Sequence, residues 1–352
     1  MKKETDKYVL AIDLGTSGPK TALITVYGEV AASEFQETPV ILMPGGGAEQ
    51  DPEIWWQAIM TAAKRMLSKN PVHPEDIAAV SVTTQWSGTV PVDRRGKNLM
   101  NAVIWMDCRG CEALKDILKG VLKFEGYPLW KVFHWLRLTG GAPASSGKDP
   151  LAHILWLKKD CSDVYEKTYK FLEPKDYINL RLTGRFAATY DSILLHWVTD
   201  NRDPSRVVYH EKLLKMAGID REKLPDLVRA VDILGTVKDD VANELGLRSD
   251  TPVIGGTPDV PSACVGSGAV RDFEGHLYIG TSSWISAHVP FKKTDLLHNF
   301  GSFPSPLPGR YLILDEQECA GKCLTWLRDN VLYTRTSSCR KRTRRTSSRS
   351  WT

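Results

Sequence analysis

The turn Gly-Thr-Ser occurs twice in this chain of 352 residues, each time between two short apolar runs rich in β-branched residues. The first copy lies in residues 8–26 (YVLAIDLGTSGPKTALITV) and the second in residues 277–289 (LYIGTSSWISAHV). Two such runs separated by a few residues predict a β-hairpin, and glycine at the tip lets the backbone approach a ligand closely. Backbone N–H groups and hydroxyls at such a tip can bind an anion. Two tips facing each other would hold the phosphates of a nucleotide, so the pattern first indicates phosphoryl transfer.

Two carboxylates stand at positions that suit this chemistry. Asp13 ends the first strand two residues before the turn, where it could hold Mg²⁺ beside nucleotide phosphates, and Lys20 on the returning strand could add positive charge. Asp259 lies in a segment of small residues, GGTPDVPSACVGSG, and could act as general base toward a substrate hydroxyl. Ordinary roles stay open for both carboxylates: a turn residue for Asp13 and a helix N-cap for Asp259.

Length and composition are typical of a globular protein with two domains. No window approaches the roughly 18 consecutive apolar residues of a membrane span, and the N-terminus lacks the apolar core of a signal peptide. Seven cysteines without framework spacing are typical of reduced thiols. We therefore expect a cytoplasmic protein with no membrane partner.

The net charge of +4 comes from the C-terminal tail, residues 331–352. This tail holds seven of the 46 Lys and Arg residues and no Asp or Glu, so the remaining chain, with 39 basic and 42 acidic residues, is mildly acidic. A Ser/Thr/Arg tail fits either an arm that binds nucleic acid or an anionic surface, or a frameshifted reading. Because the tail interrupts a helical pattern, we favour the frameshift and do not expect a nucleic-acid partner.

The apolar pattern predicts a mixed sheet with helices packed on it. Besides the two hairpins, strands are expected at residues 29–37, 77–84, 90–93, 102–105 and 252–255. Helices are expected at residues 52–67, 151–159, 165–172, 175–182 and 319–330. Gly184 is expected to stop the fourth of these helices.

Seven motifs, in order, resemble the FGGY family of carbohydrate kinases in its xylulokinase-like branch. They are AIDLGTSGPK, GGGAEQDPEIWW, TTQWSG, IWMDCR, LTG, GGTPDVPSACVGSG and YIGTSSW, and they span nearly all of residues 8–330. Asp-x-Gly-Thr alone also opens actin, Hsp70 and hexokinase-type ATPases, whereas the ordered set is specific. The resemblance implies ATP- and Mg²⁺-dependent phosphorylation of a sugar or polyol hydroxyl. It also implies an α/β fold: an RNase H-like (actin/hexokinase-type) domain followed by an incomplete second RNase H-like domain.

The resemblance carries roles over to individual residues. Asp259 matches the family's catalytic base. The phosphate-binding hairpins are matched by Asp13, Gly15, Thr16, Ser17 and Lys20, and by Gly280, Thr281 and Ser282. The sugar-contacting residues are matched by Gln85, Trp86, Ser87, Gly88, Trp105, Asp107 and Arg109. By the same resemblance, residues 1–254 form a sugar-binding domain and residues 255–330 the start of a nucleotide-binding domain.

Two departures from the family pattern affect what this chain is expected to do. The sugar loop usually reads Gln-Met-His-Gly in xylulokinases and here reads Gln85-Trp86-Ser87-Gly88, which puts xylulose as the substrate in doubt. The adenine-binding remainder of the second domain is absent before the tail, so we expect a poorly soluble chain with little turnover. A sugar-binding protein without catalysis and an actin- or Hsp70-like ATPase stay open, as does a homodimer.

Overall fold

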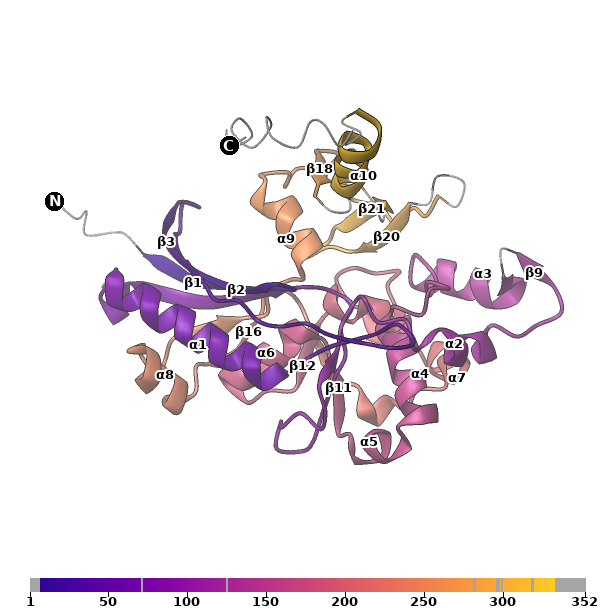
Figure 1. Ribbon diagram of the computed structural model, residues 1–352, viewed down its shortest axis with the longest axis horizontal. Helices are drawn as coiled ribbons and strands as arrows, with labels where there is room; N and C mark the ends of the chain where they lie inside the picture. Colours follow the sequence, from indigo (N-terminus) through magenta and orange to yellow (C-terminus); the bar gives the residue numbers. More distant parts are fainter. Residues whose placement is uncertain are drawn as a thin grey trace, which may run out of the picture.

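The computed structural model describes residues 7–70, 72–124, 126–280, 283–295, 298, 300–317 and 320–332. Its largest element is a six-stranded sheet (Figure 1). The strands, in spatial order, are β16 (Ile233–Thr236), β17 (Pro252–Ile254), β6 (Ile77–Thr84), β1 (Tyr8–Gly15), β2 (Gly18–Thr25) and β3 (Val30–Phe35). The first three strands of the chain form an antiparallel meander, whereas β6 runs parallel to β1 and β17 parallel to β6.

Three helices cover one face of this sheet, below it in Figure 1: α1 (Pro52–Lys69), α6 (Pro174–Thr183) and α8 (Asp239–Leu245). Helix α1 begins at Asp51, whose carboxylate accepts a hydrogen bond from the backbone N–H of Glu53 and so caps the first turn. Its apolar stripe buries Trp55 and Met66 completely against the strands. Helix α6 ends at Gly184 in the left-handed conformation, as the sequence predicts. The core of the sheet region is therefore closed on this side.

A mainly helical region with its own apolar core extends beyond the sheet. Its helices are α2 (Cys111–Ile117), α3 (Leu129–Leu138), α4 (Pro150–Asp160), α5 (Ser162–Lys167) and α7 (Glu211–Ala217). The remaining short strands form separate sheets of two or three strands: β4 (Ile41–Met43), β5 (Gly47–Gln50), β7 (Val90–Val92), β8 (Ala102–Val103), β9 (Lys123–Phe124), β10 (Tyr127–Pro128), β11 (Lys170–Leu172), β12 (Ala187–Thr189), β13 (Thr199–Asp200), β14 (Val208–Tyr209) and β15 (Asp226–Val228).

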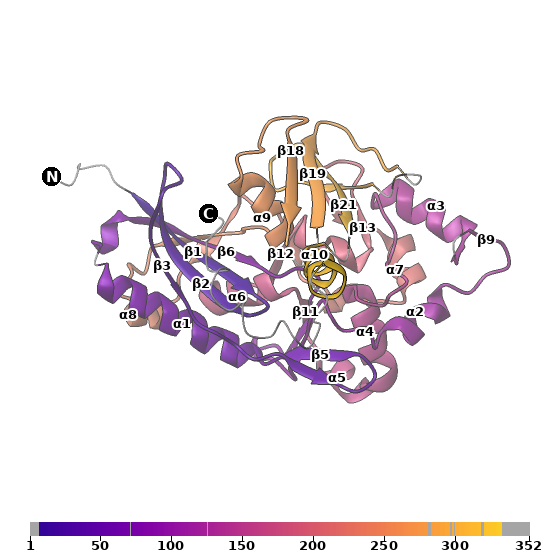
Figure 2. The same ribbon diagram turned by 45° about the horizontal axis from the view of Figure 1, so that its top comes forward.

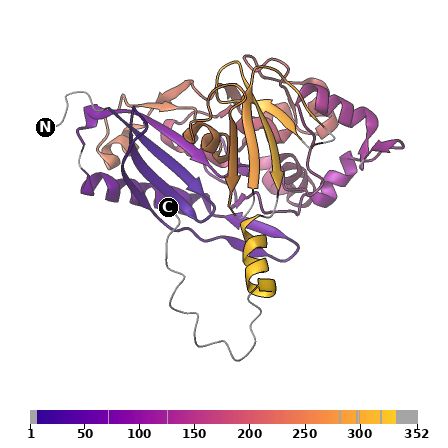
Figure 3. The ribbon, with the colours of Figure 1, turned by 90° about the horizontal axis from the view of Figure 1, so that it is seen from above.

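A second, four-stranded antiparallel sheet lies above the first in Figure 1, and Figures 2 and 3 show its strands lengthwise. In spatial order it contains β18 (Gly275–Ile279), β19 (Ser283–Val289), β21 (Tyr311–Gln317) and β20 (Gly301–Pro304). Helix α9 (Asp259–Gly266) leads into it, and α10 (Gly321–Leu327) follows it with a π-helical turn at Arg328–Leu332. Its buried apolar cluster is small, consisting of Cys264, Ala269 and Leu312.

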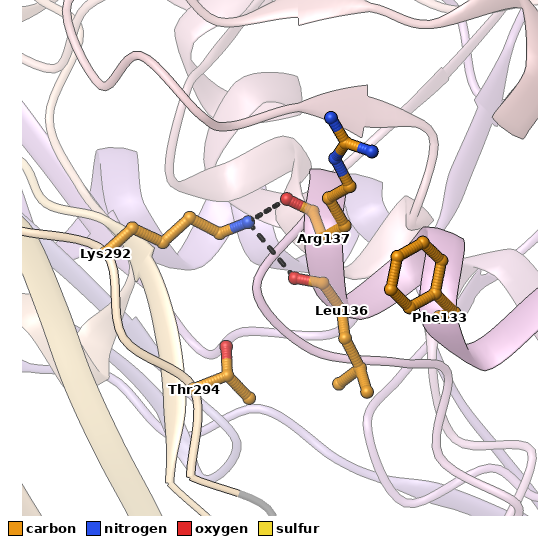
Figure 4. Close-up of a pocket in the computed structure, with 5 residues that line it drawn as sticks. All are labelled: Phe133, Leu136, Arg137, Lys292 and Thr294. Atoms are coloured by element: carbon orange, nitrogen blue, oxygen red, sulfur yellow. Dashed lines mark hydrogen bonds between the residues drawn. The ribbon is translucent and has the colours of Figure 1, made fainter.

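The loop after β19 joins the second sheet to the end of helix α3 (Figure 4). The ammonium group of Lys292 donates hydrogen bonds to the carbonyls of Leu136, at 3.1 Å, and Arg137. Thr294 donates to the carbonyl of Gly140 at 2.8 Å. The carbonyls of Leu136 and Arg137, in the last turn of α3, would otherwise lack intrahelical partners, so the contact caps α3 and fixes the second sheet against the helical region. Burial lowers the pKa of Lys292 to about 8.

The structure confirms the mixed α/β architecture and both hairpins, because β1 pairs with β2 and β18 with β19. The expected helix at residues 165–172 is wrong in its second half. Helix α5 ends at Lys167, and Lys170–Leu172 forms a strand that pairs with β7, so edge pairing overrides the helical spacing. The helix expected at 319–330 begins at Gly321, and Cys319 lies outside the described residues. Across the described part of the chain, every helix is too short or too polar to span a bilayer.

Candidate active site

The tip of the β1–β2 hairpin places Asp13 opposite Lys20, and Gly15 opposite Gly18. Burial raises the pKa of the half-buried Asp13 carboxyl, and the positive charge of Lys20 partly offsets this rise. Within the described residues, no side-chain donor is hydrogen-bonded to this carboxylate. Asp13 is therefore a desolvated carboxylate whose oxygens are open to an external partner.

Packing against the next segment holds the tip rigid. The backbone N–H of Thr38 donates to the carbonyl of Ser17 at 3.0 Å. A Cβ on Gly18 would stand 2.0 Å from the carbonyl oxygen of Gln36, so only glycine fits this approach. Gly18 also has a φ of 137°, in the region that favours glycine. The exposed Ser17 remains at the outer edge of the tip.

Asp259 opens helix α9 at the point where the chain leaves the six-stranded sheet. Its carboxylate accepts a hydrogen bond from the N–H of Val260 at 2.9 Å. Burial raises the pKa of Asp259 to about 7, and the negative charges of Asp13 and Glu316 act in the same direction. The two carboxylates predicted from sequence, 246 positions apart, are thus close enough to affect each other's charge. A carboxyl group that titrates near neutral pH is suited to proton transfer.

A chain of hydrogen bonds connects the predicted sugar loop with the hairpin tip. The Trp105 indole donates to the hydroxyl of Thr16 at 2.9 Å, and this hydroxyl donates to the Gln85 side chain at 3.0 Å. The Gln85 amide in turn donates to Gln50 at 2.7 Å, and Gln50 donates to the backbone carbonyl of Thr16 at 3.0 Å. The Thr16 hydroxyl is therefore engaged inside the protein, and Gln85 and Gln50 are buried. Trp105 keeps 41% of its surface exposed, enough to offer a ring face to a ligand.

The rest of the sugar loop is also anchored. The Trp86 indole donates to the carbonyl of Ser192 at 3.3 Å, and the Ser87 hydroxyl donates to the carbonyl of Lys148 at 2.8 Å. Ser87 has a φ of 64°, an uncommon conformation for a residue other than glycine. The N–H of Gly88 donates to the buried carboxylate of Glu173 at 2.9 Å. Among the described contacts, the Ser87 hydroxyl and the Trp86 indole N–H are therefore both hydrogen-bonded to backbone carbonyls of the protein.

Asp107 and Arg109 form a closed ion cluster. Asp107 is fully buried, and it accepts hydrogen bonds from the N–H of Ala48 at 2.8 Å and from the Arg109 guanidinium at 2.6–3.2 Å. The guanidinium also pairs with Glu49 at 2.6 Å and lies 3.9 Å from the ring centre of Trp156. The cluster supports the wall that carries Trp105. Contact of Asp107 and Arg109 with a sugar stays a prediction.

The second tip is described in part. The carbonyl of Gly280 accepts a hydrogen bond from the N–H of Gly321 at 2.8 Å, which ties the tip to the start of α10. Beside it, the rings of Tyr278 and Trp284 stack at 3.8 Å. Thr281 and Ser282 lie outside the described residues.

Sequence reasoning missed Gln50, Glu49 and Glu173 as parts of this site. Glu49 and Gln50 lie in the motif GGGAEQDPEIWW, at the end of a buried strand and directly before the helix cap Asp51. Two adjacent polar residues at such a position are a sequence signal that could have identified them. Burial raises the pKa of Glu173 well above its ordinary value. No comparable sequence signal marks Glu173.

The site fits a magnesium ion that is held partly by the protein and partly by phosphate oxygens and water. Among the described residues there is no group of three or more His, Cys, Asp or Glu that could hold a metal ion by itself. Mg²⁺ commonly binds one or two carboxylates together with phosphate oxygens and water. Asp13, with its open oxygens beside the rigid tip, fits that mode.

Known proteins match this chain over most of its length. Residues 8–266 match the N-terminal domain of the FGGY family of carbohydrate kinases. Xylulose kinase of Bacillus subtilis is 29% identical over 326 residues, which cover 92% of this chain and 62% of the relative. Gluconokinase of the same organism is 26% identical and is covered over 53% of its length. The chain therefore belongs to the FGGY family of carbohydrate kinases.

Solved structures show the same fold. The ligand-bound xylulose kinase from Lactobacillus acidophilus superposes with a TM-score of 0.80 at 24% identity, covering 92% of this chain and 62% of that chain. Glycerol kinase from Plasmodium falciparum, solved with ADP, gives a TM-score of 0.78 at 18% identity. The chain spans about 62% of the length of the xylulose kinases that it matches.

Proposed function

We propose that this chain binds a sugar or polyol and carries the catalytic base for its phosphorylation by ATP. The observation that supports this most directly is the Asp259 carboxyl, whose pKa is raised to about 7 beside the charge of Asp13. A base with this pKa is half-ionised near neutral pH and can accept the proton of a substrate hydroxyl as that oxygen attacks phosphorus.

The hairpin tip would receive the phosphates. Gly15 and Ser17 offer backbone groups and an exposed hydroxyl there, while the Thr16 hydroxyl stays engaged with Gln85. Asp13 would hold Mg²⁺, which neutralises charge on the transferring phosphoryl group when bound. Lys20, opposite Asp13, adds positive charge to the same edge. Gly280, Thr281 and Ser282 are proposed as the second phosphate-binding tip, from the residues of their motif.

The polyol side of the site would be formed by the half-exposed Trp105 and the loop from Gln85 to Gly88. An aromatic face suits the C–H surface of a sugar or polyol. Asp107 and Arg109, whose charges compensate each other, would act by fixing the turn after β8 that carries Trp105. The relatives that match are named for xylulose and gluconate, and the Trp-Ser pair of the loop leaves the particular substrate to experiment. We also propose the division into a sugar-binding domain of residues 1–254 and a nucleotide-binding part from residue 255.

The test is phosphate transfer measured on the purified chain with MgATP and a panel of pentuloses, polyols and aldonic acids. In line with the low turnover expected from the sequence, we expect slow ADP release and a phosphorylated product with at least one member of the panel, and loss of both in Asp259→Asn. Binding of a polyol to the wild-type chain without any product would instead indicate a sugar-binding protein. ATP hydrolysis that no polyol changes would indicate an ATPase of the actin or Hsp70 kind. Either of these results would overturn the proposal.

A further inference from the structure

A buried polar cluster lies beneath the segment that delivers Asp259 to the site. It consists of Lys175, Asp176, Asp191 and Ser192, each with at most 2% of its surface exposed. The first two residues open helix α6, and the other two lie at the start of the 3₁₀ turn Ser192–His196. Completely buried lysines are rare, and they persist only where other groups compensate the charge. An apolar side chain at position 175 would have avoided the cost of burying a charge, so the presence of a lysine there requires an explanation.

The hydrogen bonds of this cluster form a closed ring on the segment before Asp259. Lys175 donates to the carbonyl of Gly255 at 3.0 Å and pairs with the Asp176 carboxylate. The other oxygen of Asp176 accepts from the Ser192 hydroxyl at 2.7 Å, and the Ser192 N–H donates to Asp191 at 3.1 Å. The Thr257 hydroxyl, two residues beyond Gly255, donates to the second oxygen of Asp191.

Other contacts leave the segment little room to move. The N–H groups of Gly255 and Gly256 donate to the carbonyls of Asp232 and Ala230, each at 2.9 Å. A Cβ on Gly256 would stand 2.1 Å from the carbonyl oxygen of Val82, so the backbone lies directly on strand β6. The ring therefore fixes the side of the segment that faces away from this strand.

The same ring reaches the sugar loop. The carbonyl of Ser192 accepts the hydrogen bond from the Trp86 indole at 3.3 Å. Ser192 thus contacts both Asp191, which accepts the hydrogen bond from Thr257, and Trp86, which is predicted to contact the sugar. A purely stabilising ion pair would not need to join these two elements, which are 171 positions apart in the chain.

We propose that the ring formed by Lys175, Asp176, Ser192, Asp191 and Thr257 is a positioning device that sets Asp259 relative to Trp86. The inference rests on the proposed function, in which Asp259 is the base and Trp86 contacts the polyol. These five residues hold the acceptor of the proton and one wall of the polyol site in a single geometry. None of them is placed in contact with the reacting atoms.

The test compares two ring variants with matched controls. Thr257→Val removes the hydroxyl without a large change in volume, and Thr257→Ser restores it. Ser192→Ala removes the hydroxyl to Asp176 but keeps the backbone groups that contact Asp191 and Trp86. Ser267→Ala is the control, because it removes a hydroxyl that lies outside the ring and donates to the backbone carbonyl of Cys264, at the far end of helix α9.

We expect Thr257→Val to lower kcat about tenfold, because a misplaced base raises the activation free energy, and a rise of about 1.4 kcal/mol slows the reaction tenfold. The KM for the polyol should change less than about twofold. Thr257→Ser should recover most of kcat, and Ser267→Ala should match the wild type. Ser192→Ala should lower kcat and also raise KM. Equal kinetics of Thr257→Val and the wild type would overturn the proposal.

A second readout does not need catalysis. Backbone hydrogen exchange across residues 255–262 should be at least about tenfold faster in Thr257→Val and Ser192→Ala than in the wild type, with exchange in helix α1 unchanged. If the wild-type chain transfers no phosphate, the proposed function fails while this exchange still tests the ring. Unchanged exchange in both variants, or acceleration everywhere in the chain, shows that the cluster serves general stability and refutes the inference.

Discussion

Asp259→Asn is expected to make this protein more stable, although it removes the proposed base. The pKa of the Asp259 carboxyl rises from 3.8 to about 7 in the folded chain. The folded state therefore disfavours the ionised form. At neutral pH, folding must either protonate this carboxylate or bury it in its ionised form, and both cost free energy. Asparagine keeps the oxygen that accepts the N–H of Val260 and carries no charge. The substitution thus removes the desolvation cost while retaining the hydrogen bond.

The sign and the size follow from linkage. Below about pH 4 the carboxyl is protonated in both the folded and the unfolded chain, so it has no effect on stability. As the pH rises from about 4 to about 7, the unfolded chain loses this proton and the folded chain keeps it, so stability falls. A change of about 3 in pKa corresponds to about 4 kcal/mol. Because Asp259 is only partly buried, solvent screening reduces this to about 2 kcal/mol.

Urea denaturation at pH 5 and pH 8, followed by circular dichroism, measures this effect. Asp259→Asn should exceed the wild type in unfolding free energy by about 2 kcal/mol at pH 8 and by less than about 1 kcal/mol at pH 5. Glu274→Gln is the matched control, because Arg271 lowers the pKa of that carboxyl by a direct hydrogen bond. Its effect should have the opposite sign, with stability lost at pH 8. A gain for Asp259→Asn that is absent, or equal at both pH values, refutes the burial argument.

Three further substitutions, the last with a matched control, test the geometry of the site. Trp105→Phe keeps a ring face but removes the indole donor, so KM for the polyol should rise about fivefold in steady-state kinetics, equivalent to about 1 kcal/mol. Arg109→Met leaves the fully buried carboxylate of Asp107 without its cation, and urea denaturation should show a loss of about 3 kcal/mol. Gly256→Ala should cost more than about 3 kcal/mol, because its φ of 69° and a backbone oxygen at 2.1 Å both exclude a Cβ. Gly28→Ala, with a φ of 88° and open space around it, should cost only about 1 kcal/mol.

Local patterns in the sequence were sufficient to predict the elements that carry the site. The first hairpin, the strand Ile77–Thr84 and the helix after Asp51 occur where apolar periodicity and capping place them. In each case the apolar pattern or the capping residue lies within or next to the element itself, although the strand Ile77–Thr84 then pairs with strands far away in the chain. The segment Lys170–Leu172 was mispredicted because it pairs with β7, nearly 80 positions earlier, and helical spacing carries no information about such a partner.

The polar connections of the site could not be predicted in the same way. Residue types and motif order predict that Thr16 belongs to a phosphate tip and Gln85 to a sugar loop, but they do not predict the hydrogen bond between these residues, which are 69 positions apart. Likewise, a motif shows that Asp107 precedes Arg109 by two residues, but not that the guanidinium neutralises a fully buried carboxylate. Burial and charge compensation depend on the packed structure, and they decide whether such a residue can contact a ligand or must support one that does.

The internal use of the Thr16 hydroxyl changes how the two halves of the site would communicate. Because Trp105 donates to this hydroxyl, a polyol that stacks on the indole would act on a residue of the proposed phosphate tip. The Thr16 hydroxyl donates to Gln85, Gln85 donates to Gln50, and Gln50 donates to the backbone carbonyl of Thr16. The tip therefore cannot shift without breaking hydrogen bonds to the residues of the proposed polyol site. Phosphate would then depend on backbone N–H groups at the tip, whose direction this network fixes. Occupancy of the polyol site and the orientation of the phosphate tip should therefore be coupled, which favours transfer to a hydroxyl over transfer to water.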